Sequence, residues 1–516
     1  MRSTFMGLET ARRGMFTQQG ALHTTGHNIA NASTPGYTRQ RVNFTQTEPY
    51  PGAGLNMPQL PGQVGTGVAA GSVQRVRESF LDVQYRGENN KLGYWETRAE
   101  SYTKMEEIMN EPSDSGLSAT MDQFWQSLQD LAVNPNNPGA RSVVRQRAVA
   151  VTETFNYLSS SLTGIRADLK NEISITEKEI NSLAEQINNL NNQIADVEPH
   201  GLLPNDLYDE RDRLVDQLSS LVNIKVDYSM SGGKPSTLAE GKANITILDA
   251  KGSSLGQLVN GTGFNKLTVA FDGSDESVKT VTVGATQVDF QKFTSSGKLK
   301  ALVESYGYEK SPGEVAGVYP EMLSELDNMA YMFAYQFNLQ HQAGATPNQM
   351  NGTSTAPTPE FFSDVKNGSV DIVNKNGISG RLTISAEIGA SLDNIATSSG
   401  ANPTMGDASN IKALADLINK PFKYGNDTDS SFRNYYEVLV GGMAVESQEA
   451  ERLSSNSGTL RQAVEERRMS VSAVSIDEEM TNMIQFQHAY NASARMISLQ
   501  DELLDKIING MGTGGR

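Results

Sequence analysis

The sequence predicts a mainly α-helical protein with a β-rich insertion, in which the N- and C-terminal helices pair as a coiled coil. Three observations support this prediction. Both ends of the 516-residue chain carry apolar residues seven apart, residues 142–198 contain no proline and one glycine, and short alternating runs follow residue 226. A seven-residue repeat keeps one face of a helix turned toward a partner helix, whereas alternation is typical of half-buried strands.

Composition and charge limit the classes of protein to which the chain can belong. Its length suits roughly three domains. No apolar run reaches the roughly 18 residues of a membrane span, and "MRSTFMGLETARRG" lacks the apolar core of a cleaved signal peptide. We therefore expect no membrane insertion, and another route if the protein is exported. A formal charge of −17 argues against nucleic acid as a partner, and the absence of cysteine excludes disulfides and thiolate sites.

The N-terminal repeat predicts a helix that ends at a turn. Its apolar positions are Met1, Leu8, Met15, Leu22 and Ile29. Within "NIANASTPGYTRQR", Pro35 cannot continue a helix, and Pro35-Gly36 suits the centre of a type II turn. The alternation of polar and apolar residues after the turn then predicts a strand.

The C-terminal repeat is the stronger of the two. It runs from Met469 to Met511, and its other members are Ile476, Met483, Tyr490, Ile497 and Leu504. Residues 1–86 carry eight Lys or Arg and four Asp or Glu, whereas residues 470–516 carry three and six. Because the two ends are opposite in charge balance, we expect them to pair. A helix lying on its own globular core would show a similar pattern, and we expect unpaired ends to be frayed until they bind.

The middle of the chain predicts helices, then strands, then helices again. Isoleucines seven apart predict one long helix over residues 142–198, and Asn205 or Asp206 suits the cap of the next. "ANITILDA", "NKLTVAFDG", "SVKTVTVGATQVDF", "SVDIVNK" and "GRLTISAEI" read as strands. Helical pattern recurs at 298–308, 319–341 and 434–468, and more briefly in "SNIKALADLINKPF".

These patterns predict three regions. The first, residues 1–34 with 470–516, is a terminal helical assembly region. The second, residues 35–225 with 431–469, is mainly helical and includes an extended N-terminal arm. The third, residues 226–430, is β-rich with inserted helices around 298–342.

Few residues suggest a catalytic, cofactor or metal site. His23 and His27 have a spacing that two metal ligands could share, but no acidic or cysteine ligand accompanies them. The acidic residues of "PNDLYDERDRL" stand where they favour a helix N-terminus and where Arg211 and Arg213 can pair with them. "GTGVAAG" lacks the ending of a phosphate loop and suggests a flexible turn. We therefore predict no catalytic, cofactor or metal site and no cofactor.

The arginines of "QRVRESFLDVQYRGEN" form another candidate surface. Arg75, Arg77 and Arg86 accompany Phe80 and Tyr85, a combination found where proteins bind nucleic acid. A charged surface between subunits suits the overall acidity better, and is our expectation.

Two terminal motifs resemble a known group. "ANASTPGYTRQRV" and "SIDEEMTNMIQFQHAYNASARMISLQDELLDKIING" are similar to the terminal segments of the axial proteins of the bacterial flagellum, and each stands at the matching end. The long helix with "PNDLYDERDRL" resembles the hook-associated protein 1 family, the first junction between hook and filament. A hook or distal-rod protein is the alternative within the group. A secreted hydrolase with a helical anchor is the alternative outside it.

The resemblance implies a non-catalytic, extracellular role in the flagellum. Paired terminal helices would form the inner wall of a tube, with the β-rich region outside. The chain would leave the cytoplasm unfolded by type III export. Its partners would be copies of itself, the hook protein, hook-associated protein 3, and an export chaperone on the C-terminal region.

The resemblance also makes the turn a joint of the assembly, whose arginines we expect to meet an acidic neighbouring subunit. The residues expected at the assembly interface are Leu8, Met15, Leu22, Ile29, Pro35, Gly36, Tyr37, Arg39, Arg41, Met483, Tyr490, Ile497 and Leu504.

Overall fold

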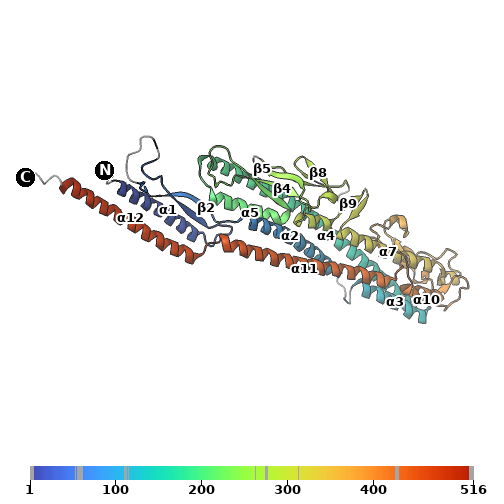
Figure 1. The fold of residues 1–516 in the computed structure, drawn as a ribbon. Coiled ribbons are helices and arrows are strands. Elements are labelled where there is room, and N and C mark those ends of the chain that lie inside the picture. The colour runs from blue at the N-terminus through green and yellow to red at the C-terminus, as the bar shows by residue number, and fades with distance from the viewer. Residues whose placement is uncertain are drawn as a thin grey trace, which may run out of the picture.

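The chain forms an elongated molecule with both termini at one end (Figure 1). The computed structural model describes residues 5–52, 54, 62–109, 113, 116–261, 263–273, 277–311, 313–424 and 429–510. Met1 and Met511 of the predicted repeats lie outside these residues. Within the described ranges, no helix is both long and apolar enough to cross a membrane.

The terminal end consists of two helices and a hairpin. Helix α1 (Phe5–Ala30) pairs with α12 (Ile476–Gly510), and strands β1 (Gln40–Gln46) and β2 (Val68–Arg75) form an antiparallel ribbon beside α1. The predicted helix, turn and first strand are confirmed. Gly36 has φ +82°, which suits the third position of a type II turn. The flexible turn predicted for Gly65–Gly71 is wrong, because this segment runs into β2.

Five helices form the middle of the molecule. They are α2 (Ser79–Met109), α3 (Leu117–Val133), α4 (Pro138–Val197), α5 (Asn205–Leu221) and α11 (Phe432–Ser472), with the 3₁₀ turn η1 (Glu198–His200) between α4 and α5. Helix α11 lies along α2, and α4 contacts α3 and α5 (Figure 1). The side chain of Asn137 caps α4 and Pro138 occupies its first turn. The predicted long helix is confirmed, since its four isoleucines, Ile173 to Ile194, are fully buried.

The cap predicted for α5 is wrong. Pro204 occupies the N-cap position, and Asn205 is the first helical residue. The Asn205 side chain instead donates to the Val73 carbonyl oxygen (3.0 Å). The amide expected to cap the helix therefore bonds to a strand that is distant in sequence.

Two small sheets lie against α4. One contains β3 (Ile224–Ser229), β4 (Lys242–Leu248) and β5 (Ser254–Asn260) in the order β3-β4-β5. The other has the order β10-β9-β7-β6, with β8 on β7, and its strands are β6 (Leu267–Phe271), β7 (Val278–Val283), β8 (Thr286–Asp289), β9 (Tyr308–Ser311) and β10 (Glu314–Ala316). Asn181 and Asn191 of α4 donate to Leu267 and Ala243 carbonyl oxygens (both 2.8 Å), which ties each sheet to the helix.

The distal end mixes helices with short strands. Its elements, together with those that lead to it, are η2 (Phe290–Lys292), α6 (Lys298–Tyr306), α7 (Val318–Gln342), β11 (Gly344–Ala345), α8 (Pro347–Met350), β12 (Phe362–Asp364), η3 (Ile372–Asn374), η4 (Ile378–Gly380), β13 (Leu382–Ile384), α9 (Ala386–Ala390), η5 (Leu392–Asn394), β14 (Ser398–Ser399), α10 (Ser409–Ala415) and η6 (Asp416–Asn419). The helices predicted near 298 and 319 are confirmed. The strand predicted for "SVDIVNK" is wrong, because this segment contains the 3₁₀ turn η3.

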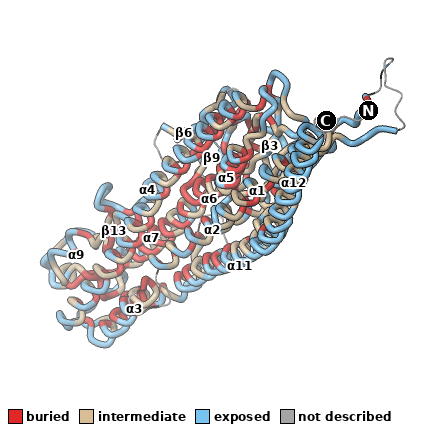
Figure 2. Tube along the Cα trace, turned by 90° about the vertical axis from the view of Figure 1, so that its left-hand side faces the viewer, coloured by how far each residue is buried: buried red, intermediate tan, exposed pale blue. Residues whose placement is uncertain are grey.

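The hydrophobic core follows the middle and distal parts (Figure 2). Aromatic rings gather where α3, α7 and the start of α11 meet. The ring centroid of Phe124 lies 5.9 Å from that of Phe333 and 5.4 Å from that of Phe337. The inserted helix α7 thus shares its core with α3 and α4. The terminal helices contribute only Ala21 to the buried apolar residues described.

Candidate functional site at the joint of the terminal helices

The terminal helices meet in an antiparallel seam. On α12 the half-buried residues recur at the three- and four-residue spacing of a coiled coil: Met483, Phe486, Tyr490, Ser493, Ile497, Gln500 and Leu504. Gly7 and Gly14 of α1 face Gln500 and Ser493. A Cβ at Gly7 would lie 2.7 Å from Gln500 Nε2, and one at Gly14 would lie 3.1 Å from Ser493 Oγ. These glycines allow the helices to approach closely.

On α1, the predicted seam residues are only half-buried. Leu8, Met15, Leu22 and Ile29 all have intermediate exposure. The fully buried residues are instead Thr17, Ala21, Thr25 and Asn28. Thr17 donates to the Val68 carbonyl oxygen of β2 (3.2 Å) and Asn28 bonds to Gln40 of β1. Helix α1 therefore has a second contact face toward the hairpin.

The predicted C-terminal repeat does not all lie in this seam. The chain bends between Ser472 and Ile476, so Met469 belongs to α11 while Ile476 begins α12. Met469 is 51% exposed and Ile476 is 55% exposed. A sequence repeat that looked continuous is thus divided between two helices.

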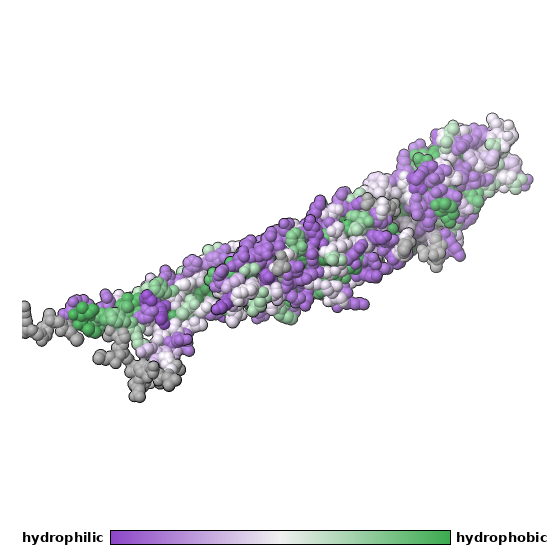
Figure 3. Space-filling model, turned by 90° about the horizontal axis from the view of Figure 1, so that it is seen from above, coloured by the Kyte–Doolittle hydropathy of each residue, from purple (hydrophilic) through white to green (hydrophobic). Residues whose placement is uncertain are grey.

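A second apolar stripe on α12 faces solvent. Met496, Leu499, Leu503 and Ile507 recur three and four residues apart, and each is between 44% and 49% exposed. Figure 3 shows hydrophobic surface gathering at the end of the molecule that these helices occupy. An apolar stripe of this kind is a candidate interaction surface.

Asn28, near the end of α1, is the centre of the hydrogen-bond network around the turn. Its Oδ1 accepts hydrogen bonds from Tyr37 Oη (2.8 Å) and the Gln40 backbone N–H (3.0 Å), while its Nδ2 donates to the Gln40 carbonyl oxygen (2.8 Å) and Glu479 Oε2 (3.2 Å). These four bonds use the full capacity of the amide. His27 Nδ1 lies 3.0 Å from Tyr37 Oη. The end of α1, the turn and the start of α12 are therefore held by one buried side chain.

Arg39 fastens the same turn to α12. Its Nε donates to Glu479 Oε1 (2.7 Å) and its Nη1 to Glu478 Oε2 (2.6 Å), and its backbone N–H donates to the Ser472 carbonyl oxygen (2.9 Å). The expectation that Arg39 meets an acidic neighbouring subunit is wrong, because Arg39 pairs with Glu478 and Glu479 of its own chain. Arg41, Pro35 and Gly36 are exposed. The opposite charges at the two ends of the chain meet at this pair.

A buried ion-pair network lies behind the joint. Arg75 Nη1 lies 2.7 Å from Asp209 Oδ1 and 2.9 Å from Asp212 Oδ2, and Arg77 binds Asp82 through two hydrogen bonds of 2.7 and 2.8 Å. Arg86 and Arg468 each contact Asp216, from α2 and α11 respectively (2.7 and 2.6 Å). The network thus joins the hairpin to α2, α5 and α11.

This network corrects the expectation for Arg75, Arg77 and Arg86. Their side chains are between 4% and 13% exposed, so they form neither a subunit surface nor a nucleic-acid surface. Burial alone would raise the pKa of Asp212, but Arg77 and Arg75 hold that pKa below its usual range. At Asp209 burial prevails over Arg75 and raises the pKa. Because these carboxylates are desolvated, loss of an arginine partner would leave a buried unpaired charge and destabilise the fold.

The other candidate sites have structural surroundings. His23 is exposed, and His27 bonds to Tyr37. Over the ranges that the structure describes, no cluster of three or more His, Asp and Glu side chains could hold a metal ion. Glu210 pairs with Arg213 (2.5 Å), as expected, whereas Arg211 turns to Glu240 (2.7 Å).

Sequence reasoning missed Asn28 and Glu479, the two buried residues on which the joint depends. Asn28 stands beside Ile29 of the N-terminal repeat and Glu479 stands three residues after Ile476 of the C-terminal one, and both look like ordinary polar helix residues. The charge balance of the two ends was the one signal that could have pointed to Glu479.

Family models match the chain in three places. Residues 102–355 match the flagellar hook-associated protein FlgK helical domain, residues 466–510 the flagellar basal body rod FlgEFG protein C-terminal, and residues 8–38 the flagella basal body rod protein. The rod-type matches cover only the ends. The helical-domain match separates the chain from the hook and distal-rod alternative.

Whole-chain relatives agree with these matches. Flagellar hook-associated protein 1 of Bacillus subtilis is 47% identical over 100% of both chains. The protein of that name from Salmonella typhimurium is 25% identical over 97% of this chain and 98% of its own. The solved flagellar hook junction protein FlgK from Burkholderia pseudomallei has the same fold, with a TM-score of 0.57 and 15% identity over 75% of this chain and 100% of that one. Identity at this level over the full length places the chain in the flagellar hook-associated protein 1 family.

Proposed function

We propose that this chain is a structural, non-catalytic subunit of the bacterial flagellum that joins the hook to the filament-side junction protein. Its terminal helices would pair with each other and then with copies of itself. The family supports the place of the chain in the flagellum, and the terminal helices support the mechanism.

The observation that carries the mechanism is the outward stripe of α12. One face of α12 already packs on α1, yet Met496, Leu499, Leu503 and Ile507 remain about half exposed. A helix with two apolar faces is stabilised by two partners. A neighbouring copy in a repeating assembly supplies the second partner through a head-to-tail contact.

Each group of residues would have its own role in the assembly. The seam residues Leu8, Met15, Leu22, Ile29, Met483, Tyr490, Ile497 and Leu504 would form the pair. Pro35, Gly36, Tyr37 and Arg39 would set the angle between the terminal region and the helical region, with exposed Arg41 facing outward. Residues 226–430 would lie on the outside of the assembly.

The remaining partners belong to the same proposal. The hook protein and hook-associated protein 3 would bind opposite sides of a ring of copies. An export chaperone would cover the exposed stripe of α12 in the cytoplasm, because a free apolar stripe favours aggregation. The chain would then be exported by the type III route to the outside of the cell.

A matched pair of variants tests the mechanism. Leu499→Asp places a carboxylate in the outward stripe, and Ser498→Asp places the same group one residue away on the exposed polar side. In a strain that lacks the gene, we expect the Leu499→Asp chain to leave cells without attached filaments, because an unpaired carboxylate in an apolar contact costs several kcal/mol. The Ser498→Asp chain should restore filaments.

Electron microscopy of filament attachment and swimming in soft agar provide the readouts. Purified Leu499→Asp should keep the hydrogen exchange of the wild-type α1 and α12, which separates failed assembly from unfolding. Ile497→Asp should disturb both exchange and attachment. Normal filaments with Leu499→Asp would contradict the proposed contact, and normal filaments after deletion of the gene would contradict the junction itself.

A further inference from the structure

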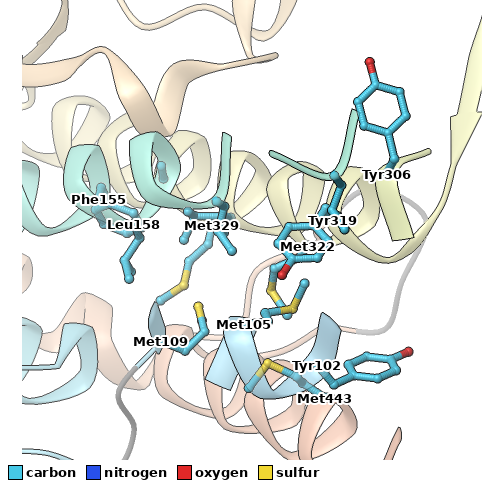
Figure 4. Packing of buried hydrophobic residues seen from close by; sticks show 14 of the residues in the cluster. Tyr102, Met105, Met109, Phe155, Leu158, Tyr306, Tyr319, Met322, Met329 and Met443 are labelled. Atoms are coloured by element: carbon cyan, nitrogen blue, oxygen red, sulfur yellow. The ribbon is translucent and has the colours of Figure 1, made fainter. Parts of the chain in front are cut away.

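A groove of about 1080 Å³ lies between α2, α7 and α11, away from the terminal joint. Its floor is methionine-rich: Met105 of α2, Met322 of α7 and Met443 of α11 converge there (Figure 4). All three are at most 7% exposed, and Tyr102 lies beside them. Methionine side chains are flexible and polarisable, so they adapt to apolar groups of different shapes.

The walls and mouth of the groove are acidic. Four carboxylates line it, from Glu304, Glu321, Glu325 and Glu446, together with one guanidinium, from Arg98. Arg98 is already shared, lying 3.6 Å from Glu304 and 3.4 Å from Glu446. Glu321 stands exposed at the mouth. Glu304 is also paired with Lys300 (3.5 Å). The groove therefore offers an apolar floor surrounded by four carboxylates and two cations.

Gly442 keeps the groove open. It lies within the 41-residue helix α11, where a glycine costs about 1 kcal/mol relative to alanine. Packing does not require it, since a Cβ at this position would meet no atom within 4 Å. A larger side chain at this position would project into the groove that Gly442 lines.

We propose that this groove binds a basic amphipathic helix of a partner protein. The apolar stripe of such a helix would cover the methionine floor, and its Lys or Arg residues would meet Glu321, Glu325 and Glu446. The exposed apolar stripe of α12 from a second copy is a poorer occupant, because residues 496–507 carry three carboxylates and one ammonium group and would bring further negative charge to an acidic groove.

The test uses a fluorescent Leu/Lys peptide of about 18 residues, with leucines spaced three and four apart, as the probe. We expect the full chain to bind it with one-to-one stoichiometry, and to bind the matching Leu/Glu peptide at least about a hundredfold more weakly. Fluorescence anisotropy at low and high salt measures both affinities. Added salt should weaken binding of the Leu/Lys peptide.

Two neighbouring glycines provide the matched variants. Gly442→Leu should weaken binding at least about tenfold by filling the groove. Gly441→Leu should not change it, because Gly441 is equally open but does not line the groove. Glu321→Gln with Glu446→Gln should also weaken binding about tenfold. Glu179→Gln with Glu185→Gln, which removes the same charge from an exposed face of α4, should have no effect.

Two results would overturn the proposal. Equal binding to the Gly442→Leu and Gly441→Leu chains would show that the peptide only adheres to an acidic surface. Self-association of the wild-type chain in analytical ultracentrifugation that Gly442→Leu removes would make a second copy the occupant instead.

Discussion

The terminal helix pair and the helical middle are both built from long helices, but they bury very different side chains. Helix α4 buries apolar residues along its whole length, from Val144 to Ile194. Within the described part of α12, the one buried residue is Glu479, a charged side chain. Burial of apolar area is the main source of folding free energy. We therefore expect the middle of the molecule to supply most of the folding free energy and the terminal pair to supply little.

The first prediction compares one core residue from each region. Phe124→Ala should lower the free energy of unfolding of the middle region by about 4 kcal/mol, because the ring is fully buried among other aromatic rings. Tyr490→Ala, in the half-buried terminal seam, should change the same quantity by less than about 0.5 kcal/mol. Urea unfolding followed by near-UV circular dichroism measures both. A Tyr490→Ala loss as large as that of Phe124→Ala would show that the two regions fold as one unit.

The second prediction uses a buried histidine in the distal part of the middle region. His341 Nε2 accepts from the Ala396 backbone N–H (2.9 Å), so its Nδ1 carries the proton and donates to the Pro359 carbonyl oxygen (3.0 Å). Burial lowers the pKa of His341 from 6.5 to about 4, against the opposing effect of the Pro359 carbonyl. A proton on Nε2 would break the bond from Ala396.

The sign of the pH effect follows from this lowered pKa. The unfolded chain takes up the proton below about pH 6.5, whereas the folded chain resists it down to about pH 4, so stability falls over that window by about 3 kcal/mol. Urea unfolding at several pH values measures the slope, and His341→Gln should flatten it. The hydrogen exchange of α12 should not follow this window. A terminal region that opened together with the distal core would contradict the separation.

The third and smallest effect concerns the joint between the two regions. Arg39→Ala should speed hydrogen exchange at the start of α12 by about thirtyfold, because it removes the exposed pair with Glu478 and leaves the buried Glu479 carboxylate without its cation, which together cost about 2 kcal/mol. Arg41→Ala should leave exchange unchanged, since Arg41 is exposed. Exchange in α4 should be the same in both variants. If it also accelerated, the joint would be part of the middle core.

Much of the fold could be predicted because it depends on local periodicity. The isoleucines of α4 report one buried face directly, and Pro35 ends a helix whatever surrounds it. Predictions failed where a distant group took over a local role. The Asn205 side chain bonds to Val73 and not to its own helix end, and the end of the glycine-rich segment Gly65–Gly71 forms the start of β2, which pairs with β1.

At the candidate site, the face of α12 that packs on α1 could be predicted from the sequence, whereas the ion pairs around the turn could not. Spacing in the sequence is enough to place Met483, Tyr490, Ile497 and Leu504 on one face of a helix, because helical geometry fixes that face. The pairing of Arg39 with Glu479, the pairing of Arg75 with Asp212 and the exposure of one apolar stripe of α12 follow from how the helices pack. Charge attraction has no sequence period, so the partner of a buried arginine is set by which helices pack together.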